Sequence, residues 1–301
     1  MGLTRLSKGL VQPELILKPT DNLIINGNFD FWRRGLNFTL TESGYTTDRW
    51  FVYSNGASVV ALSTDVPHGN ATRSMSLTGD YWYHGAMQII ENGAIICDNS
   101  PISISAMVKG PEGKTAAISV GWITDGELYT FTGDWQKIKT VVEIPAGFAG
   151  LSANAGGVNL YVHPVRCINQ GTLEDGDEVK ISQVKVELGH VVTPFYPRQI
   201  ALEDYMCKRY YEYVSFSHLP MIAADTSSIF SYIRYVQKRV VPSFTYSGAY
   251  TYRLAYGWQE PESFVITPQL SYIIVNHIMT DAFVTGNSYL GLGNLYLNAE
   301  L

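Results

Sequence analysis

The sequence predicts an all-β protein made of two domains joined by one short helix. Apolar residues recur at every second position in several segments, which is the period of strands with one buried face. The 301 residues include 27 glycines and 13 prolines, which supply the turns between short strands, and only one segment has a clear helical spacing. A chain of this length is enough for about two domains.

The strands of the first domain are marked by alternating apolar residues. The alternation occurs in residues 102–108, 118–122 and 138–144, and Gly-Pro-Glu-Gly at 110–113 predicts a turn. After Ile181 the apolar residues change to the opposite parity, which predicts a β-bulge at Ser182 and Gln183. This rhythm is typical of a β-sandwich.

Helical spacing occurs where Leu202, Met206, Tyr210 and Val214 follow each other at four-residue intervals. We therefore expect a helix over 202–214, directly after the rigid Pro-Phe-Tyr-Pro segment that ends the sandwich. The expected organisation is an N-terminal arm over 1–21, a sandwich domain over 22–197, a linking helix within 198–215 and a smaller C-terminal β-domain over 216–301.

An aromatic stripe is the most regular pattern of the C-terminal domain. Every even position from Phe244 to Trp258 is aromatic, Leu or Gly, which predicts a hairpin folded at Ser247 and Gly248. The stripe is either the core face of that domain or a surface that meets a partner chain or receptor. The residues proposed for a partner interface are Tyr250, Tyr252, Tyr256 and Trp258.

Composition excludes several functional classes. Lys and Arg number 21 against 27 Asp and Glu, and this net charge of −6 argues against nucleic-acid binding. No apolar segment approaches the ~20 residues needed to cross a bilayer, so membrane insertion is not expected, and no secretion signal is visible. The three cysteines and six histidines lack the spacing of metal sites, and no catalytic motif is present. We expect no catalytic residues and no enzymatic activity.

Aromatic residues beside polar ones indicate a binding surface. Tyr-Trp-Tyr-His at 81–84 lies between Gly79 and Gly85, and sugar rings stack on such side chains through their apolar C–H faces. Alternatively, these aromatic residues cap the sandwich core. The candidate carbohydrate-binding residues are Tyr81, Trp82, Tyr83 and His84, with Trp122, Asp125 and Tyr129 as a second wall.

Six segments resemble tail fibre and receptor-binding proteins of tailed bacteriophages. The opening resemblance is carried by Asn-Leu-Ile-Ile-Asn-Gly-Asn-Phe-Asp-Phe-Trp-Arg-Arg-Gly at 22–35 and Gly-Tyr-Thr-Thr-Asp-Arg-Trp at 44–50. Val-Glu-Leu-Gly at 186–189, Thr-Pro-Phe-Tyr-Pro-Arg at 193–198 and Cys-Lys-Arg-Tyr-Tyr-Glu at 207–212 resemble the strand, exit and helix that end their first module. Leu-Asn-Ala-Glu-Leu at 297–301 resembles the end of their small C-terminal domain, so the resemblance covers 22–301.

This resemblance implies a non-catalytic virion structural protein that mediates host attachment. It implies a tail fibre, tip or decoration protein, made in the host cytoplasm and displayed on the particle exterior as a homotrimer. The implied partners are further copies of the chain, another tail or capsid protein and a bacterial surface glycan.

The first module also resembles the jelly-roll fold of galactose-binding-like carbohydrate-binding modules. The expected fold is thus a jelly-roll β-sandwich, a linking helix and a smaller C-terminal β-sandwich domain. Those modules often hold a structural calcium near their opening segment, and here Asp30 stands at the position of the acidic ligand.

Two other functions stay open at this point. One is a polysaccharide-degrading enzyme that uses carboxylates such as Asp80, Asp125 or Asp134 as acid and base, which hydrolysis of host polysaccharide would reveal. The other is a stand-alone lectin, which a monomer binding one sugar would favour.

Overall fold

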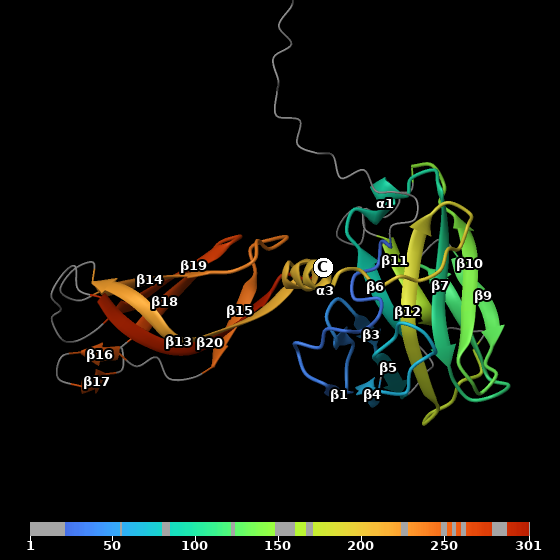
Figure 1. Cartoon of the computed structure of the whole chain (residues 1–301), viewed down its shortest axis with the longest axis horizontal. Helices are drawn as coiled ribbons and strands as arrows, with labels where there is room; N and C mark the ends of the chain where they lie inside the picture. Colours follow the sequence, from blue (N-terminus) through green and yellow to red (C-terminus); the bar gives the residue numbers. More distant parts are fainter. Residues whose placement is uncertain are drawn as a thin grey trace, which may run out of the picture.

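The structure is a computed structural model with two β-structured units and a helix between them (Figure 1). The all-β prediction is confirmed. Among the described residues, no helix is both long and apolar enough to span a membrane. The expected arm over 1–21 lies outside the described residues. The structure describes residues 22–54, 56–79, 85–121, 124–147, 160–166, 171–223, 228–247, 252–254, 257–259, 263–278 and 288–300.

The first unit is a jelly-roll sandwich of two antiparallel sheets, each of six strands. The first sheet has the strand order β1-β4-β5-β12-β7-β10. Its strands are β1 (Asn37–Leu40), β4 (Ser58–Ser63), β5 (Ser74–Thr78), β12 (Glu178–Leu188), β7 (Pro101–Lys109) and β10 (Gln136–Glu143).

The second sheet faces the first and has the order β2-β3-β6-β11-β8-β9. A single turn of helix, α1 (Gly93–Ile96), follows β6. The strands are β2 (Gly44–Tyr45), β3 (Phe51–Tyr53), β6 (Gly85–Ile90), β11 (Leu160–Arg166), β8 (Thr115–Val120) and β9 (Thr124–Thr130).

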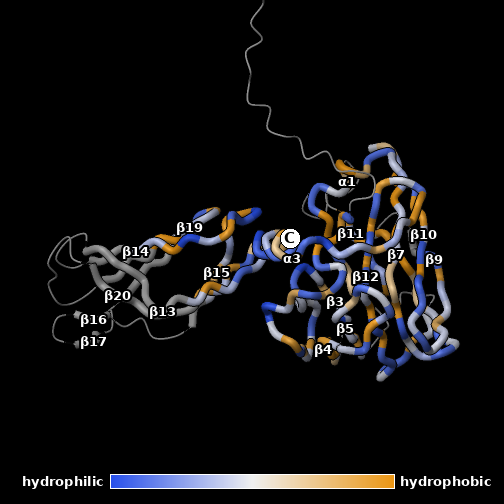
Figure 2. The backbone as a smooth tube through the Cα atoms, viewed as in Figure 1, coloured by the Kyte–Doolittle hydropathy of each residue, from blue (hydrophilic) through white to orange (hydrophobic). Residues whose placement is uncertain are grey.

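The sandwich core includes the alternating residues that the sequence singled out. Hydrophobic positions recur along the strands of the sandwich (Figure 2). Ile102, Ile104 and Val108 of β7 and Ile118 of β8 are buried in one continuous cluster. The predicted bulge is confirmed, because the pairing of β12 with β7 shifts between Ser182 and Lys185, and Gln183 has a φ of 51°. Local apolar alternation therefore predicted both the strands and the point where their parity changes.

The linking helix, α3 (Ile200–Lys208), is shorter than the predicted 202–214. The chain is extended again from Tyr211, the first residue of β13 (Tyr211–Ala223). Tyr210 and Val214 happen to fit the helical spacing, but Tyr-Glu-Tyr-Val at 211–214 is also an alternating, β-favouring segment, and pairing with another strand outweighs the weak helical preference. The prediction of helix beyond Lys208 was wrong.

The second unit contains a six-stranded antiparallel sheet in the order β15-β20-β13-β14-β19-β18 and a separate pair, β16 with β17. The strands after β13 are β14 (Ser228–Arg234), β15 (Ser243–Ser247), β16 (Tyr252–Leu254), β17 (Gly257–Gln259), β18 (Ser263–Pro268), β19 (Tyr272–Ile278) and β20 (Ser288–Asn298).

The predicted hairpin at 247–248 is corrected by this pairing. β15 pairs with β20, and β16 pairs with β17. A two-residue period defines the face of a strand but not its neighbour, so the alternation could not reveal this arrangement. Tyr250 and Tyr256 lie outside the described residues, and for Tyr252 and Trp258 the structure describes only the backbone, in β16 and β17.

The sheet of the second unit has one buried and one exposed face. Ile233 pairs with Ile273 and both are buried, as is Leu297. Tyr213 of β13 and Tyr232 of β14 have the opposite parity and are 43% and 63% exposed. The exposed face thus carries tyrosines.

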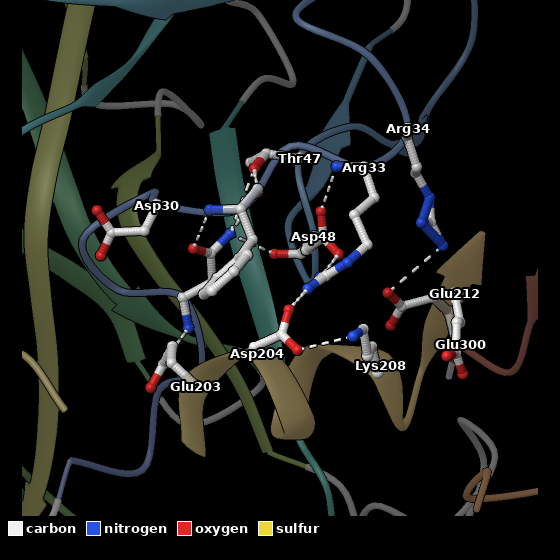
Figure 3. Close-up of polar contacts among 12 residues, drawn as sticks. Asp30, Arg33, Arg34, Thr47, Asp48, Glu203, Asp204, Lys208, Glu212 and Glu300 are labelled. Atoms are coloured by element: carbon white, nitrogen blue, oxygen red, sulfur yellow. Dashed lines mark hydrogen bonds and ion pairs between the residues drawn. The ribbon is translucent and has the colours of Figure 1, made fainter. Parts of the chain in front are cut away.

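A buried ionic network joins the two units. Arg49 of the sandwich is 1% exposed and forms an ion pair with Glu300, the penultimate residue of the chain. Arg33 donates to Asp48 at 2.6 Å and also pairs with Asp204 of α3 (Figure 3). Burial by itself lowers the pKa of Arg49, but Glu300 together with Tyr210 and Tyr45 outweighs this effect and the pKa is raised, so the guanidinium is charged.

The opening segment at 22–35 forms the scaffold of this junction. The amide of Asn26 donates to the carbonyl oxygens of Phe31 and Asp48 at 2.9 and 3.0 Å, and its own backbone N–H donates to Glu203 of α3. Asn26 has a φ of 57°, a left-handed conformation that Asn tolerates better than most residues. The segment is therefore structural.

We predict that Glu300→Gln destabilises the protein by about 3 kcal/mol, because it leaves the buried charge of Arg49 without its carboxylate. Urea unfolding followed by tryptophan fluorescence measures this change. Lys114→Gln is the matched control, since Lys114 pairs with the exposed Glu174 and its loss should cost less than about 0.5 kcal/mol. Equal effects of the two substitutions would contradict the role of the junction.

Candidate functional site

The second sheet of the sandwich turns one face to the core and the other outward. Val52, Ile118 and Val162 point into the core. The residues of opposite parity on β2, β3 and β11 lie on the outer face, where an aromatic row crosses the sheet. We define this aromatic row as Tyr45, Phe51, Tyr53 and His163.

Ring contacts connect the aromatic row from one strand to the next. Tyr45 meets Phe51 edge to face with 5.2 Å between ring centroids, and Phe51 meets Tyr53 in the same way at 5.3 Å. The Tyr53 ring is stacked with the His163 ring at 6.1 Å. Tyr53 and His163 belong to β3 and β11, which lie on either side of β6. The row therefore spans four neighbouring strands, from β2 across β3 and β6 to β11.

Gly85 of β6 makes the contact between Tyr53 and His163 possible. It pairs with Tyr53, and a Cβ atom at this position would lie 2.3 Å from the carbonyl oxygen of Val165. The close approach of β11 thus requires glycine, and no side chain stands beside Tyr53 on β6.

His163 adds an uncharged polar group to the row. The side chain is 5% exposed, and burial together with the nearby Arg166 guanidinium lowers its pKa to about 3. Its Nδ1 atom is buried and has no hydrogen-bond partner among the described residues. A neutral imidazole nitrogen exchanges hydrogen bonds readily with a hydroxyl group, and an unsatisfied buried one is costly. Arg166 in turn donates to Ser119 at 3.3 Å.

Of the residues that the sequence proposed for sugar binding, the structure describes the side chain of Tyr129 alone. Tyr81, Trp82, Tyr83, His84 and Trp122 lie outside the described residues, and for Asp125 only the backbone, in β9, is described. Tyr129 packs edge-on against Phe131 at 5.2 Å and its hydroxyl donates to the Pro164 carbonyl at 3.3 Å, so its contacts are with the sandwich core.

Sequence reasoning missed the aromatic row itself. Phe51 and Tyr53 are separated by one residue, which is the spacing of a strand face, but three residues of β3 are too few for a convincing alternation. His163 was noted only as an isolated histidine without metal-site spacing. The stacking partner of each ring comes from a strand distant in sequence.

The calcium ion that the resemblance implied at Asp30 stays a prediction. Calcium takes six to eight oxygen ligands from carboxylates, amide and backbone carbonyl groups and water. The Asp30 carboxylate accepts hydrogen bonds from Asn28 and Thr72, and the Arg73 guanidinium donates to the Asp30 carbonyl at 2.6 Å. Asn28 Oδ1 is buried without a partner among the described residues, and an amide oxygen is one of the ligands that calcium takes. No cluster of three acidic, His or Cys ligands occurs in the described part of the chain.

Comparisons with known proteins place sugar-binding modules among the similar solved structures. The CBM22-1 xylan-binding domain of Paenibacillus barcinonensis Xyn10C has 13% identity and a TM-score of 0.35, over 58% of this chain and 99% of that domain. The C-terminal family 22 carbohydrate-binding module of Clostridium thermocellum Xyn10B has 14% identity and a TM-score of 0.35, over 53% and 98%.

A phage protein is also among the similar structures. The enzymatically active domain of bacteriophage CBA120 tailspike protein 4 has 15% identity and a TM-score of 0.32, over 57% of this chain and 22% of that one. No family model matches the sequence, and no curated protein matches it. Similarities at this level do not assign a ligand.

We predict that His163 makes the protein less stable in acid. The unfolded chain takes up this proton near pH 6.5, whereas the folded chain does so only near pH 3, so stability is greatest above pH 6.5 and falls as the pH drops toward 3. In His163→Phe the melting temperature should decline less between pH 6.5 and 4 than in the wild type. His190→Phe, at an exposed histidine, should follow the wild type; a wild-type profile for His163→Phe would contradict the assignment.

Proposed function

We propose that this protein binds carbohydrate, without catalysis, on the outer face of the second sandwich sheet. The observation that carries the proposal is the aromatic row beside the unpartnered Nδ1 of His163. Sugar rings offer apolar C–H faces that stack on aromatic rings and hydroxyl groups that need hydrogen-bond partners. The row provides both kinds of contact on one face.

Accessibility differs along the row and identifies Tyr53 as the main contact. Tyr53 is 39% exposed, whereas His163 is almost completely buried beside it. In the proposed site a sugar ring stacks on Tyr53, and one of its hydroxyl groups exchanges a hydrogen bond with the imidazole of His163. The pairing of an exposed aromatic ring with a buried polar group is typical of ligand sites in which stacking gives affinity and hydrogen bonds give orientation.

The carboxylates considered for hydrolysis give this alternative little support. Asp134 is exposed in the turn between β9 and β10, and Asp80 and the Asp125 side chain lie outside what the structure describes. Because glycoside hydrolysis needs two carboxyl groups on either side of one bond, an exposed turn residue is a poor candidate for either role. Release of reducing ends from a bound polysaccharide would nevertheless revive the hydrolase.

We predict that Tyr53→Ala weakens glycan binding at least about tenfold, since loss of a central aromatic contact costs about 1.4 kcal/mol or more. A glycan array followed by titration calorimetry on the best ligand measures this. Tyr205→Ala is the matched control, because Tyr205 is also an exposed tyrosine and lies on α3, outside the row. An unchanged affinity in a folded Tyr53→Ala protein, or no binding by the wild type to any glycan, would contradict the proposal.

We further propose that the chain acts on the exterior of a bacteriophage particle as a receptor-binding homotrimer, attached to another tail or capsid protein. The support is the distribution of the segments that resemble phage fibre proteins. Arg34, Arg49, Tyr210 and Glu300 come from four of these segments, and in the structure they meet at one junction. Segments that are far apart in the sequence but share the resemblance therefore contact one another at the junction of the two units.

Light scattering after size exclusion tests this assembly. Three copies of a 33.5 kDa chain have a mass of about 100 kDa, as a closed cyclic arrangement requires. We expect this mass, and we expect antibodies against the chain to block adsorption of the phage that encodes it. A monomer that binds one sugar would favour the stand-alone lectin instead.

A further inference from the structure

The aromatic row reaches the edge of the sandwich at the junction with the second unit. Its last member, Tyr45, lies on β2, the outermost strand of the second sheet. The guanidinium of Arg34 lies over the Tyr45 ring, 5.5 Å from its centroid. The same guanidinium lies 3.7 Å from the centroid of Tyr211, the first residue of β13. Arg34 thus connects aromatic rings of the two units.

Aromatic residues continue from Tyr211 across the sheet of the second unit. Tyr213 shares a face with Tyr211 because they are two residues apart on β13. Tyr213 pairs with Tyr296 of β20, and their ring centroids lie 5.1 Å apart. Tyr213 is 43% exposed, which leaves it open to a ligand.

A hollow lies beside this tyrosine pair, next to the junction. It has a volume of about 300 Å³, which is within the range of small-ligand pockets. Aromatic rings and short hydroxyl and amide side chains surround it together, as they do in sugar-binding sites. The lining residues are Tyr211, Ser243, Phe244, Thr245, Tyr296 and Asn298.

Arg34 has an unused hydrogen-bond donor between the two surfaces. Its side chain is 10% exposed, and Nη1 is buried without a hydrogen-bond partner among the described residues. Nη2 donates to Asn298 at 3.2 Å. It also pairs with Glu300 at 3.5 Å (Figure 3). A sugar hydroxyl group, whose oxygen accepts hydrogen bonds, can satisfy the remaining donor.

We infer that the carbohydrate site continues across the junction, from the aromatic row over Arg34 to Tyr213 and Tyr296, and that its ligand is an extended polysaccharide segment rather than a single sugar. This inference rests on the proposed function. It assigns the second unit a set of ligand contacts of its own. The buried pairs of Arg49 and Arg34 with Glu300 hold the two sets at a fixed spacing, so a long chain engages the second set without a further ordering cost.

Chain-length dependence of binding tests the inference on the intact protein. The probes are neutral xylo-, cello- and galacto-oligosaccharides of increasing length and size-fractionated bacterial surface polysaccharide, each titrated by calorimetry. We expect the affinity for the recognised series to rise at least about tenfold from short to long oligomers, because the second set of contacts is reached intramolecularly.

Substitutions on the second unit separate this inference from the proposed function. Tyr213→Ala and Tyr296→Ala should remove most of the extra affinity that long oligomers have over short ones, and should leave the affinity for short oligomers unchanged. Tyr232→Ala is the matched control, since Tyr232 is exposed on the same face but stacks with Tyr272 of β19. Melting curves verify that each variant is folded.

Each other outcome has a distinct meaning. If no oligomer binds at any length, the proposed function itself fails. Short oligomers that bind the wild type but not Tyr53→Ala would support the sandwich site. If the affinity then does not rise with oligomer length, or if the rise survives both tyrosine substitutions, the extended site is refuted. If Tyr213→Ala lowers the mass in solution and leaves every affinity unchanged, this face is a contact between copies of the chain and the inference is wrong.

Discussion

The buried ion pair between Arg49 and Glu300 is the constraint on which the arrangement of the two units depends. Arg49 is buried within the sandwich unit, and a buried guanidinium without a counter-charge is strongly unfavourable. Its carboxylate comes from the penultimate residue of the chain, so the end of the second unit must return to the first. Through β20 and its pairing with β13, this return places Tyr211 beside Arg34.

The junction also explains why the opening segment is rich in Asn and Arg. Asn26 organises the backbone turn, Arg33 joins Asp48 to Asp204 of the helix, and Arg34 spans two aromatic rings. Burial by itself lowers the pKa of Arg33, but Asp48 and Asp204 outweigh it and the pKa is raised. These residues hold the units together, and in doing so they connect the two surfaces that we propose for one glycan.

Much of the fold could be predicted from local sequence, because strand faces are defined by side chains two residues apart. Ile102 to Val108 and the bulge at Ser182 follow from this rule alone. The end of α3 and the partner of β15 could not be predicted in this way. Both are decided by β20, which is distant in sequence from the segments it pairs with. Tertiary pairing overrides a short helical spacing at Tyr210 and Val214.

The candidate site was harder to predict than the fold. Its rings come from β2, β3 and β11, and its polar group, His163, is unremarkable in sequence. Only the close approach at Gly85 brings Tyr53 and His163 together, and a glycine in a strand does not reveal which residues lie across it. Tyr129, by contrast, had a suitable side chain but lies on the core side of its strand. Side-chain chemistry indicated a binding protein, whereas the location of the site depends on topology.

The most direct measurement is a crystal structure of the protein with a long oligosaccharide from the series that it binds. We expect sugar residues stacked on Tyr53, continuing past Arg34 and ending in the hollow beside Tyr296. Electron density for the sugar on another face of the sandwich would contradict the account. So would a sheet face of the second unit that is covered by a neighbouring copy of the chain.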